Sequence, residues 1–532
     1  RLPLVLTPQG TQTYISTFKL NKPHLWQGRK DPYLYKVISR LLADGKVIDE
    51  VVQPLGVRRY EIVPGKGFYL NGEKYPMYGV TRHQDWWGLG SALTNKEHDF
   101  DLAQIMDIGA TTVRFAHYQQ SDYLYSRCDS LGLVIWAEIP FVNRVTGYEA
   151  ENAQSQLREL IRQSFNHPSI YVWGLHNEVY HEYTAGLTQT LHNLAKTEDP
   201  DRYTVSVNGY GHAEHPVNQN ADIQGMNRYF GWYEKKLQDI EPWIKGLEEK
   251  YPWQKLMLTE YGADANLDHQ TEYLGDALNW GKSFYPETFQ TKTHEYQWSV
   301  IAKHPYIIAS YLWNMFDFAA DARSEGGENG MNHKGLVTFD RKYKKDSFYA
   351  YKAWLSDEPF VHICGKRYID RPESVTSVTV YTNEPSVELF ANGKSIGVQK
   401  RGEFPFFYFS VPNEGETVLT AKAGDCTDES RIRKVDKANP DYVLQEEGAV
   451  INWFEIETPP GYMSVNDTIG DILATAKGKL LALKILKMVR ANMKKNKGKS
   501  TGGMADMAKG MKINKSMIEM GKGFSVKRVC MM

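Results

Sequence analysis

The chain has 532 residues, of which 42% are hydrophobic and 24% are charged, and its 63 Lys and Arg residues nearly balance 64 Asp and Glu residues. This composition is typical of globular proteins and excludes a wholly disordered chain. No apolar run approaches the roughly 20 residues of a membrane-spanning helix, and the four cysteines are too sparse for a disulfide scaffold and lack the CxxC spacing of a zinc site.

The first 62 residues are predicted to form a partial β-sandwich. Two β-rich segments, 33–38 and 46–52, flank Asp44-Gly45, a pair typical of hairpin turns. The length of the chain suggests about three or four domains. We expect the others at 63–358, 359–436 and 437–532.

Eight short apolar or β-rich runs follow one another between 63 and 358. They span 75–82, 111–118, 133–140, 170–178, 203–210, 221–229, 255–262 and 306–318. Most are separated by helical stretches, and strands that alternate with helices pair in parallel, so the pattern predicts an α/β fold, a (β/α)₈ barrel. The helix between the fifth and sixth runs is the weakest element, because that gap is short. A doubly wound open sheet is the competing architecture, but no GxGxxG opens a helix here.

Polar side chains stand at the C-terminal ends of these runs, the face at which barrel active sites lie. A cluster of this size would be costly in a closed, inert structure, which favours a functional site. The residues are Arg82, His83, Arg114, His117, Glu138, Asn177, Glu178, Asn227, Tyr229, Glu260, Tyr261, Trp313 and Asp317.

Glu178 and Glu260 end the fourth and seventh runs, on strands that face each other across a barrel mouth. Glycoside hydrolysis needs such a pair, with one carboxyl protonated to assist the leaving oxygen and the other ionised to attack the anomeric carbon. Burial and mutual repulsion would raise the pKa of the acid. The alternative is that both are structural ion-pair members, with Arg82, Arg114 or Arg228 as partners. Asn177 could bind the sugar 2-hydroxyl or cap the strand, and Tyr229 could steady the nucleophile or be a core residue.

The C-terminal part of the chain divides into two regions. The alternating segment 377–382 and the hairpin signal Asn392-Gly393 predict an immunoglobulin-like β-sandwich over 359–436. Residues 437–532 are predicted to be mainly helical and truncated. From Asp471 onward they hold 15 Lys and Arg against 3 Asp and Glu, which indicates either a site for an anionic partner or a solvated helical face.

Three motifs resemble glycoside hydrolase family 2. The segment 174–178 (GLHNE) is similar to its acid/base signature, 258–262 (LTEYG) to its nucleophile signature, and 114–118 (RFAHY) to its SHYP segment, with Ala and Gln in place of Ser and Pro. The resemblance implies a retaining exo-β-glycosidase with Glu178 as general acid/base and Glu260 as nucleophile. It implies substrate contacts at His83, His117, Asn177, Tyr229 and Trp313. Family members usually begin with a further jelly-roll domain, which we expect this chain to lack.

Substrate choice depends on Asn332 and Lys334, which can present an amide and an ammonium to one carboxylate. They are similar to the Asn-x-Lys motif with which β-glucuronidases of the family bind the C6 carboxylate, and the segment 227–233 is similar to a glucuronidase segment. The sequence therefore favours a β-glucuronidase. A β-galactosidase or β-galacturonidase of the same family is the alternative, and Lys334 could instead be an exposed loop lysine.

No cofactor is expected for catalysis and no metal site is predicted, since His83 and His117 lack a sequence-local ligand partner. The region after 440 is similar to an extension of gut bacterial β-glucuronidases, a few of which bind FMN there. The expected partner is a small glycoside or oligosaccharide, and no nucleic acid or membrane partner is predicted. A homo-oligomer is possible under this prediction. A cytoplasmic location is favoured because no signal peptide is visible. A non-catalytic carbohydrate-binding protein is the alternative of another class.

Overall fold

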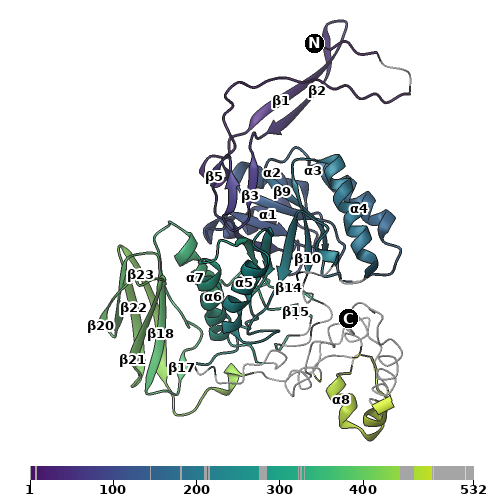
Figure 1. Ribbon diagram of the computed structural model, residues 1–532. Helices are drawn as coiled ribbons and strands as arrows, with labels where there is room; N and C mark the ends of the chain where they lie inside the picture. Colours follow the sequence, from purple (N-terminus) through teal and green to yellow (C-terminus); the bar gives the residue numbers. More distant parts are fainter. Residues whose placement is uncertain are drawn as a thin grey trace.

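The computed structural model describes residues 2–5, 9–143, 145–179, 182–208, 213, 216–272, 274, 284–320, 323, 326–328, 330–443, 461–465, 467–481, 483, 484, 522 and 526. Its centre is a closed barrel of eight parallel strands in the order β10-β11-β12-β13-β6-β7-β8-β9 (Figure 1). The strands are β6 Tyr78–Arg82, β7 Thr112–Phe115, β8 Val134–Glu138, β9 Ile170–Asn177, β10 Tyr203–Asn208, β11 Ile223–Asn227, β12 Leu256–Glu260 and β13 Ile307–Leu312. Each predicted run contains one of them, so the barrel prediction is confirmed.

Helices cover the outside of the barrel. The first begins at a capping box, in which the Thr94 hydroxyl and the Glu97 carboxylate satisfy each other's backbone N–H groups, and it buries Leu102 and Ile105 against the strands. Between β10 and β11 the described residues form only the 3₁₀ helix η2 Pro216–Asn218, in line with the short gap in the sequence. The helices are α1 Asn95–Asp107, α2 Asp122–Leu131, α3 Ala150–Ser164, α4 Glu182–Glu198, η3 Leu237–Asp239, α5 Ile240–Lys250, α6 Glu287–Ile301 and α7 Asp346–Leu355.

A small antiparallel sheet covers the N-terminal end of the barrel. It consists of β3 Tyr60–Val63, β4 Gly67–Leu70 and β5 Glu73–Lys74. The Phe68 ring packs edge-on against Tyr171, near the start of β9, at 5.4 Å between centroids, and the Tyr203 hydroxyl at the start of β10 accepts a hydrogen bond from the Ile62 N–H. Because this sheet covers the N-terminal end, we expect an active site at the opposite, C-terminal rim of the barrel.

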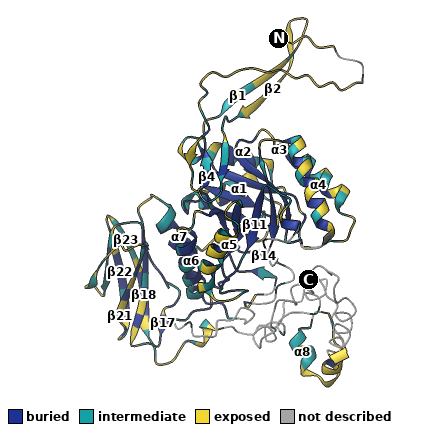
Figure 2. Ribbon diagram, in the orientation of Figure 1, coloured by how far each residue is buried: buried dark blue, intermediate teal, exposed yellow. Residues whose placement is uncertain are grey.

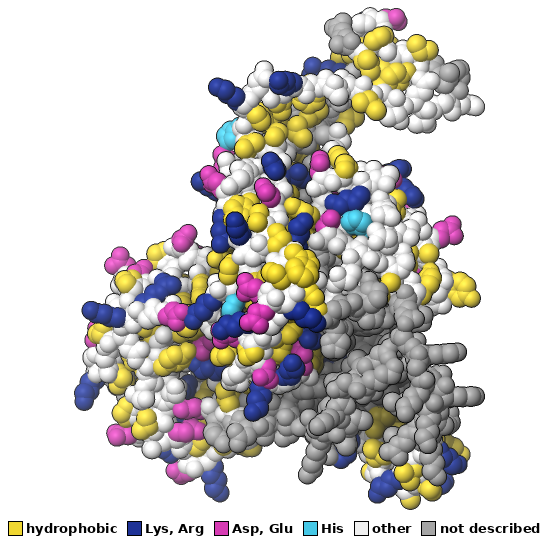
Figure 3. All heavy atoms as spheres, in the orientation of Figure 1, with side chains coloured by type: hydrophobic (Ala, Val, Ile, Leu, Met, Phe, Trp, Pro, Cys, Tyr) yellow, Lys and Arg dark blue, Asp and Glu magenta, His cyan; other side chains and the backbone are white. Residues whose placement is uncertain are grey.

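The hairpin predicted around Asp44-Gly45 is present as β1 Tyr35–Ala43 and β2 Lys46–Leu55, preceded by η1 Gly28–Lys30. Both turn residues have positive φ angles, 52° for Asp44 and 79° for Gly45, as the predicted turn requires. The hairpin extends away from the barrel and exposes apolar side chains (Figures 1 and 3), among them Ile38, Val47, Ile48, Val51 and Val52. The predicted boundaries of the four domains stay a prediction.

Two sheets after the barrel pack face to face around one apolar core (Figure 2). One contains β16 Val361–Ile363, β18 Val375–Thr382 and β21 Phe406–Pro412; the other contains β17 Asp370–Arg371, β23 Cys426–Lys434, β22 Glu416–Ala423, β19 Ser386–Ala391 and β20 Lys394–Lys400. Val380 and Phe407 from the first sheet meet Leu389 and Leu419 from the second. The Asn392-Gly393 hairpin is confirmed, since Ala391 pairs with Lys394.

Most of the predicted helical region 437–532 lies outside the described residues. The described part contains η4 Pro440–Tyr442 and α8 Ile469–Ala474. None of the described helices is long and apolar enough to span a membrane.

Candidate active site

The C-terminal rim of the barrel gathers the polar residues that the sequence singled out. Glu138, Asn177 and Glu260 are the last residues of β8, β9 and β12, and His83 and Glu178 directly follow β6 and β9. Parallel strands point their C-terminal ends the same way, so these side chains converge on one opening. Two short strands, β14 Phe318–Ala319 and β15 Met331–Asn332, bring Asn332 and Lys334 to the same rim.

Glu260 is held by donors on both carboxylate oxygens. Its Oε1 lies 3.0 Å from Arg114 Nη1 and 3.9 Å from His117 Nε2, and its Oε2 accepts a hydrogen bond of 2.7 Å from the Tyr229 hydroxyl. Burial, and then the charge of Glu260, raise the pKa of Tyr229 well above its usual value, so Tyr229 stays a donor. Both oxygens of the Glu260 carboxyl are therefore bound by hydrogen-bond donors.

Glu178 has a different environment. Its backbone φ of 56° turns it out of the β9 direction, and its Oε1 accepts a hydrogen bond of 2.9 Å from Asn227 Nδ2. Burial, and then the negative charge of Glu260, raise the pKa of Glu178 to about 7, although the Asn227 bond opposes them. At neutral pH one carboxyl is therefore partly protonated and the other is held by cationic and hydroxyl donors.

A small hydrogen-bond network connects the two glutamates. Asn227, which contacts Glu178, is the register partner of Glu260 in the β11–β12 pair. Asn177 Oδ1 accepts hydrogen bonds from Asn227 at 3.3 Å and from Arg114 at 2.8 Å. The hydrogen-bonded pair Asn177 and Asn227 thus connects Glu178 to Arg114. Arg114 in turn binds Glu260.

Arg114 is the centre of this network, although the sequence predicted for it only membership of the polar cluster at the strand ends and a possible ion pair. It is fully buried, and its guanidinium binds both oxygens of Glu138 as well as Glu260. It also lies 4.4 Å from the centroid of the Trp136 ring. The other two arginines pair elsewhere, Arg82 with Asp101 at 2.8 Å and Arg228 with Glu234 at 3.2 Å.

Aromatic rings form one wall of the opening. His117 stacks on Trp313 at 5.0 Å, and His83 stacks on Phe318 at 4.3 Å. The Nε2 atom of His83 is buried without a hydrogen-bond partner among the described residues, and burial holds the pKa of His83 well below its usual range. A neutral imidazole with an unused nitrogen beside flat rings suits a sugar hydroxyl.

Lys334 is not the exposed loop lysine of the alternative interpretation, because its side chain is fully buried. Its Nζ lies 2.5 Å from Asp264 Oδ2 and 2.5 Å from the Tyr233 hydroxyl, and Arg323 Nη1 lies 3.7 Å from the other Asp264 oxygen. The Asn332 side chain accepts a hydrogen bond of 3.1 Å from the Lys334 N–H. Sequence reasoning missed Asp264 and Arg323; the position of Asp264 four residues after Glu260 was the available signal.

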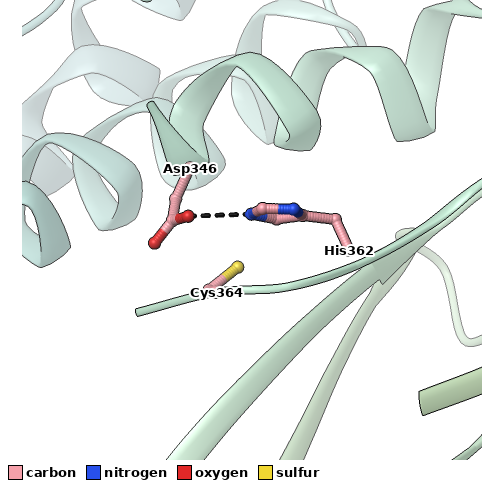
Figure 4. A group of neighbouring side chains, drawn as sticks. All are labelled: Asp346, His362 and Cys364. Carbon is pink, nitrogen blue, oxygen red and sulfur yellow. Dashed lines mark hydrogen bonds and ion pairs between the residues drawn. The ribbon is translucent and has the colours of Figure 1, made fainter. Parts of the chain in front are cut away.

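A second group of described residues has the composition of a metal site. Asp346, His362 and Cys364 are buried and can bring one ligand atom each within 4.8 Å of one another (Figure 4). However, Asp346 already binds His362 Nε2 at 2.9 Å and the Gly365 N–H at 2.7 Å, and the Arg367 cation lies 3.9 Å from it. Burial also raises the pKa of the Cys364 thiol, which disfavours the thiolate a metal needs. These contacts make the group an ion-pair network between α7 and β16.

Comparison with known proteins shows matches along most of the described chain. Residues 62–356 match the TIM barrel domain of glycosyl hydrolases family 2, residues 3–58 match a second family 2 domain, and residues 373–425 match a domain of unknown function. The chain is 41% identical to a β-glucuronidase from Bacteroides fragilis over 396 residues, which is 72% of this chain and 56% of that protein.

Two solved structures are similar in fold and sequence. One, from Bacteroides fragilis and provisionally described as a β-galactosidase, is 71% identical with a TM-score of 0.79 and is matched over 81% of this chain and 66% of its own. The other, an FMN-binding β-glucuronidase from Facaelibacterium prausnitzii L2-6, is 38% identical with a TM-score of 0.76 over 80% of this chain and 66% of its own. The chain thus spans between about half and two thirds of the length of these relatives.

Proposed function

Since the chain belongs to glycoside hydrolase family 2, as its motifs predicted, we propose that it hydrolyses β-glucuronides with retention of configuration. The observation that carries the hydrolase proposal is the unequal pair at the rim. Glu178 has a pKa of about 7, whereas Glu260 accepts from Arg114 and Tyr229. A retaining glycosidase needs one protonated and one ionised carboxyl at the same bond.

In the proposed reaction Glu260 attacks the anomeric carbon while Glu178 gives its proton to the departing glycosidic oxygen. The anomeric carbon is then bonded to Glu260, and the aglycone leaves as an alcohol. Glu178, now ionised, takes a proton from water, the resulting hydroxide displaces Glu260, and both carboxyls return to their starting states. In this proposal Asn177 would bind the 2-hydroxyl, and His83, His117 and Trp313 would line the sugar subsite.

Glucuronide rather than galactoside specificity is supported by the Lys334 cluster. Lys334 and Arg323 both lie beside the carboxylate of Asp264, and Tyr233 contacts both cations. A substrate carboxylate near Lys334 and Asn332 would meet an ammonium in a buried setting, where charge pairing is strong. The relative that is 41% identical is named a β-glucuronidase.

A β-galactosidase is the second candidate, because the 71% identical structure carries that provisional description. The two are separated by comparing p-nitrophenyl β-glucuronide, β-galactoside and β-galacturonide with the full chain. Turnover of any of them excludes a non-catalytic binding protein. Lys334→Ala should lower kcat/KM for the glucuronide at least about thirtyfold, the effect of losing roughly 2 kcal/mol of buried ion pairing.

The matched control for this experiment is Lys342→Ala, whose lysine is exposed and pairs with Asp340 at 3.0 Å. It should leave all three substrates unchanged. An equal loss on the glucuronide and the galactoside in Lys334→Ala would contradict carboxylate recognition.

FMN binding by the region after 440 belongs to this proposal only as an extension of it. The Facaelibacterium relative is named FMN-binding, and the basic residues from 471 onward would suit a phosphate. Most of these residues lie outside the described part of the chain, so the measurement is direct: flavin absorbance that stays with the purified chain through gel filtration after incubation with FMN.

A further inference from the structure

Lys345, which directly precedes α7, is a buried lysine that the proposed mechanism does not use. Its side chain is fully buried, and Nζ donates three hydrogen bonds of 2.8 Å each, to Asp317 Oδ1, the Ala265 carbonyl and the His333 carbonyl. An ammonium has three protons, so every donor of this group is satisfied by a different segment of the chain.

Each of the three segments carries a residue of the Lys334–Asp264 pair or of the aromatic wall that includes Trp313. Ala265 follows Asp264, which pairs with Lys334, and His333 precedes Lys334 itself. Asp317 follows Trp313 after the end of β13. The Lys345 ammonium therefore joins the three loops.

The loops are also joined to one another around this ammonium. Asp317 Oδ1 accepts a second hydrogen bond, 2.8 Å from the Gly335 N–H, and the Ala265 N–H donates to the His333 carbonyl at 3.0 Å. A Cβ at Gly335 would lie 2.0 Å from the Asp317 nitrogen, so only glycine permits this approach. The loop that carries Lys334 is thus held on both sides of that residue.

Two of the three Lys345 contacts go to loop backbone carbonyls, and the third goes to the Asp317 carboxylate, which binds loop backbone in turn. Burying an ammonium is costly, and a buried ion pair is often no more stabilising than apolar packing of the same volume. We propose that Lys345 is instead a positioning residue. It acts through Lys334 by fixing the backbone on both sides of the carboxylate subsite, the proposed site of the substrate carboxylate at Asn332 and Lys334. This inference rests on the proposed glucuronidase function, and Lys345 itself does not touch the substrate.

The test is steady-state kinetics of the full chain with p-nitrophenyl β-glucuronide. Lys345→Met keeps the length of the side chain and removes its three donors, and we expect KM to rise at least tenfold while kcat stays within threefold. The dissociation constant of the same glycoside, measured by calorimetry in a Glu260→Gln background, should rise in parallel. A general loss of structure would lower kcat or the active fraction without this selective change.

The matched control is Lys352→Met, on the helix α7 that follows Lys345. Lys352 is also a buried, ion-paired lysine, but it binds Asp107 at 2.6 Å and Glu358 at 3.0 Å, and not the three loops. It should leave KM unchanged. If Lys345→Met does not fold, as judged by circular dichroism, Asp317→Asn takes its place; it keeps the shape but removes the counter-charge, and KM should rise three- to tenfold.

The outcomes separate this proposal from the one on which it rests. If Lys334→Ala raises KM for the glucuronide and both Lys345→Met and Asp317→Asn leave it unchanged, positioning by Lys345 is wrong and the carboxylate subsite stands. If Lys334→Ala also leaves KM unchanged, or the parent neither binds nor cleaves the glucuronide, the proposed subsite fails, and the role of Lys345 fails with it.

Discussion

Replacing Glu178 by Gln removes the proton that the proposed mechanism gives to the leaving group, while the shape of the side chain is kept. The size of the effect follows from the environment of this carboxyl. With a pKa of about 7, Glu178 is about 90% protonated at pH 6, whereas an ordinary glutamate with a pKa of about 4.3 would be about 2% protonated. Burial beside Glu260 therefore raises the acid-competent fraction by roughly 45-fold at this pH.

The assay is kcat/KM for p-nitrophenyl β-glucuronide from pH 4.5 to 9. The parent should lose activity with a one-proton midpoint near pH 7, because the acid form of Glu178 disappears as the pH rises through its pKa. Glu178→Gln should lack this limb and should be about 10²–10⁴-fold slower at pH 6, the usual contribution of a positioned acid. The loss should be smaller for a more acidic phenol, because its oxygen needs less protonation to leave.

Glu198→Gln serves as the control, since Glu198 lies on α4 and pairs with Arg158 and Arg162. It should keep the parental pH profile. A limb near pH 7 that survives in Glu178→Gln would refute the assignment, as would a parent whose activity is flat between pH 6 and 9.

Three further outcomes follow from the same contacts. Tyr229→Phe removes the 2.7 Å hydrogen bond to Glu260, and since a bond to a charged group is worth about 1.5–3 kcal/mol, kcat/KM should fall about 10- to 160-fold in steady-state assays; parental kinetics would contradict this role. Asp101→Asn breaks the buried pairs that Asp101 makes with Arg82 and Arg341, so urea titration should show a loss of about 3–5 kcal/mol in the free energy of unfolding, and a loss below 1 kcal/mol would count against it. The folded protein binds the Glu178 proton more tightly than the unfolded chain, so parental stability falls as pH rises from about 4.5 to 7; Glu178→Gln should therefore raise the melting temperature more at pH 8 than at pH 5, and an equal change at both would contradict the raised pKa.

The barrel could be predicted because its signal is local and repeated. Each of the eight apolar runs contains one strand, and since parallel strands share a direction, the polar residue that ends each run had to lie on the same rim. Both hairpins were also predicted, because Asp44-Gly45 and Asn392-Gly393 adopt the positive φ angles that such turns require.

The partners of these residues could not be predicted, because they depend on barrel closure. Arg114 and Glu260 are 146 residues apart and meet only when β7 and β12 enter one barrel, and Lys334 meets Asp264 across 70 residues. The sequence offered Arg82, Arg114 and Arg228 equally as partners for the glutamates, and only the fold assigns Arg114 to Glu260.

The residue types and their order along the chain thus predicted the barrel and identified Glu178 and Glu260 as the candidate pair. What the tertiary structure decided is the difference between them: burial and a neighbouring charge hold a proton on Glu178, while donors from β7 and from the loop after β11 surround Glu260. A pKa reflects the charges and solvent around a group in space, and neither can be read from its neighbours in sequence.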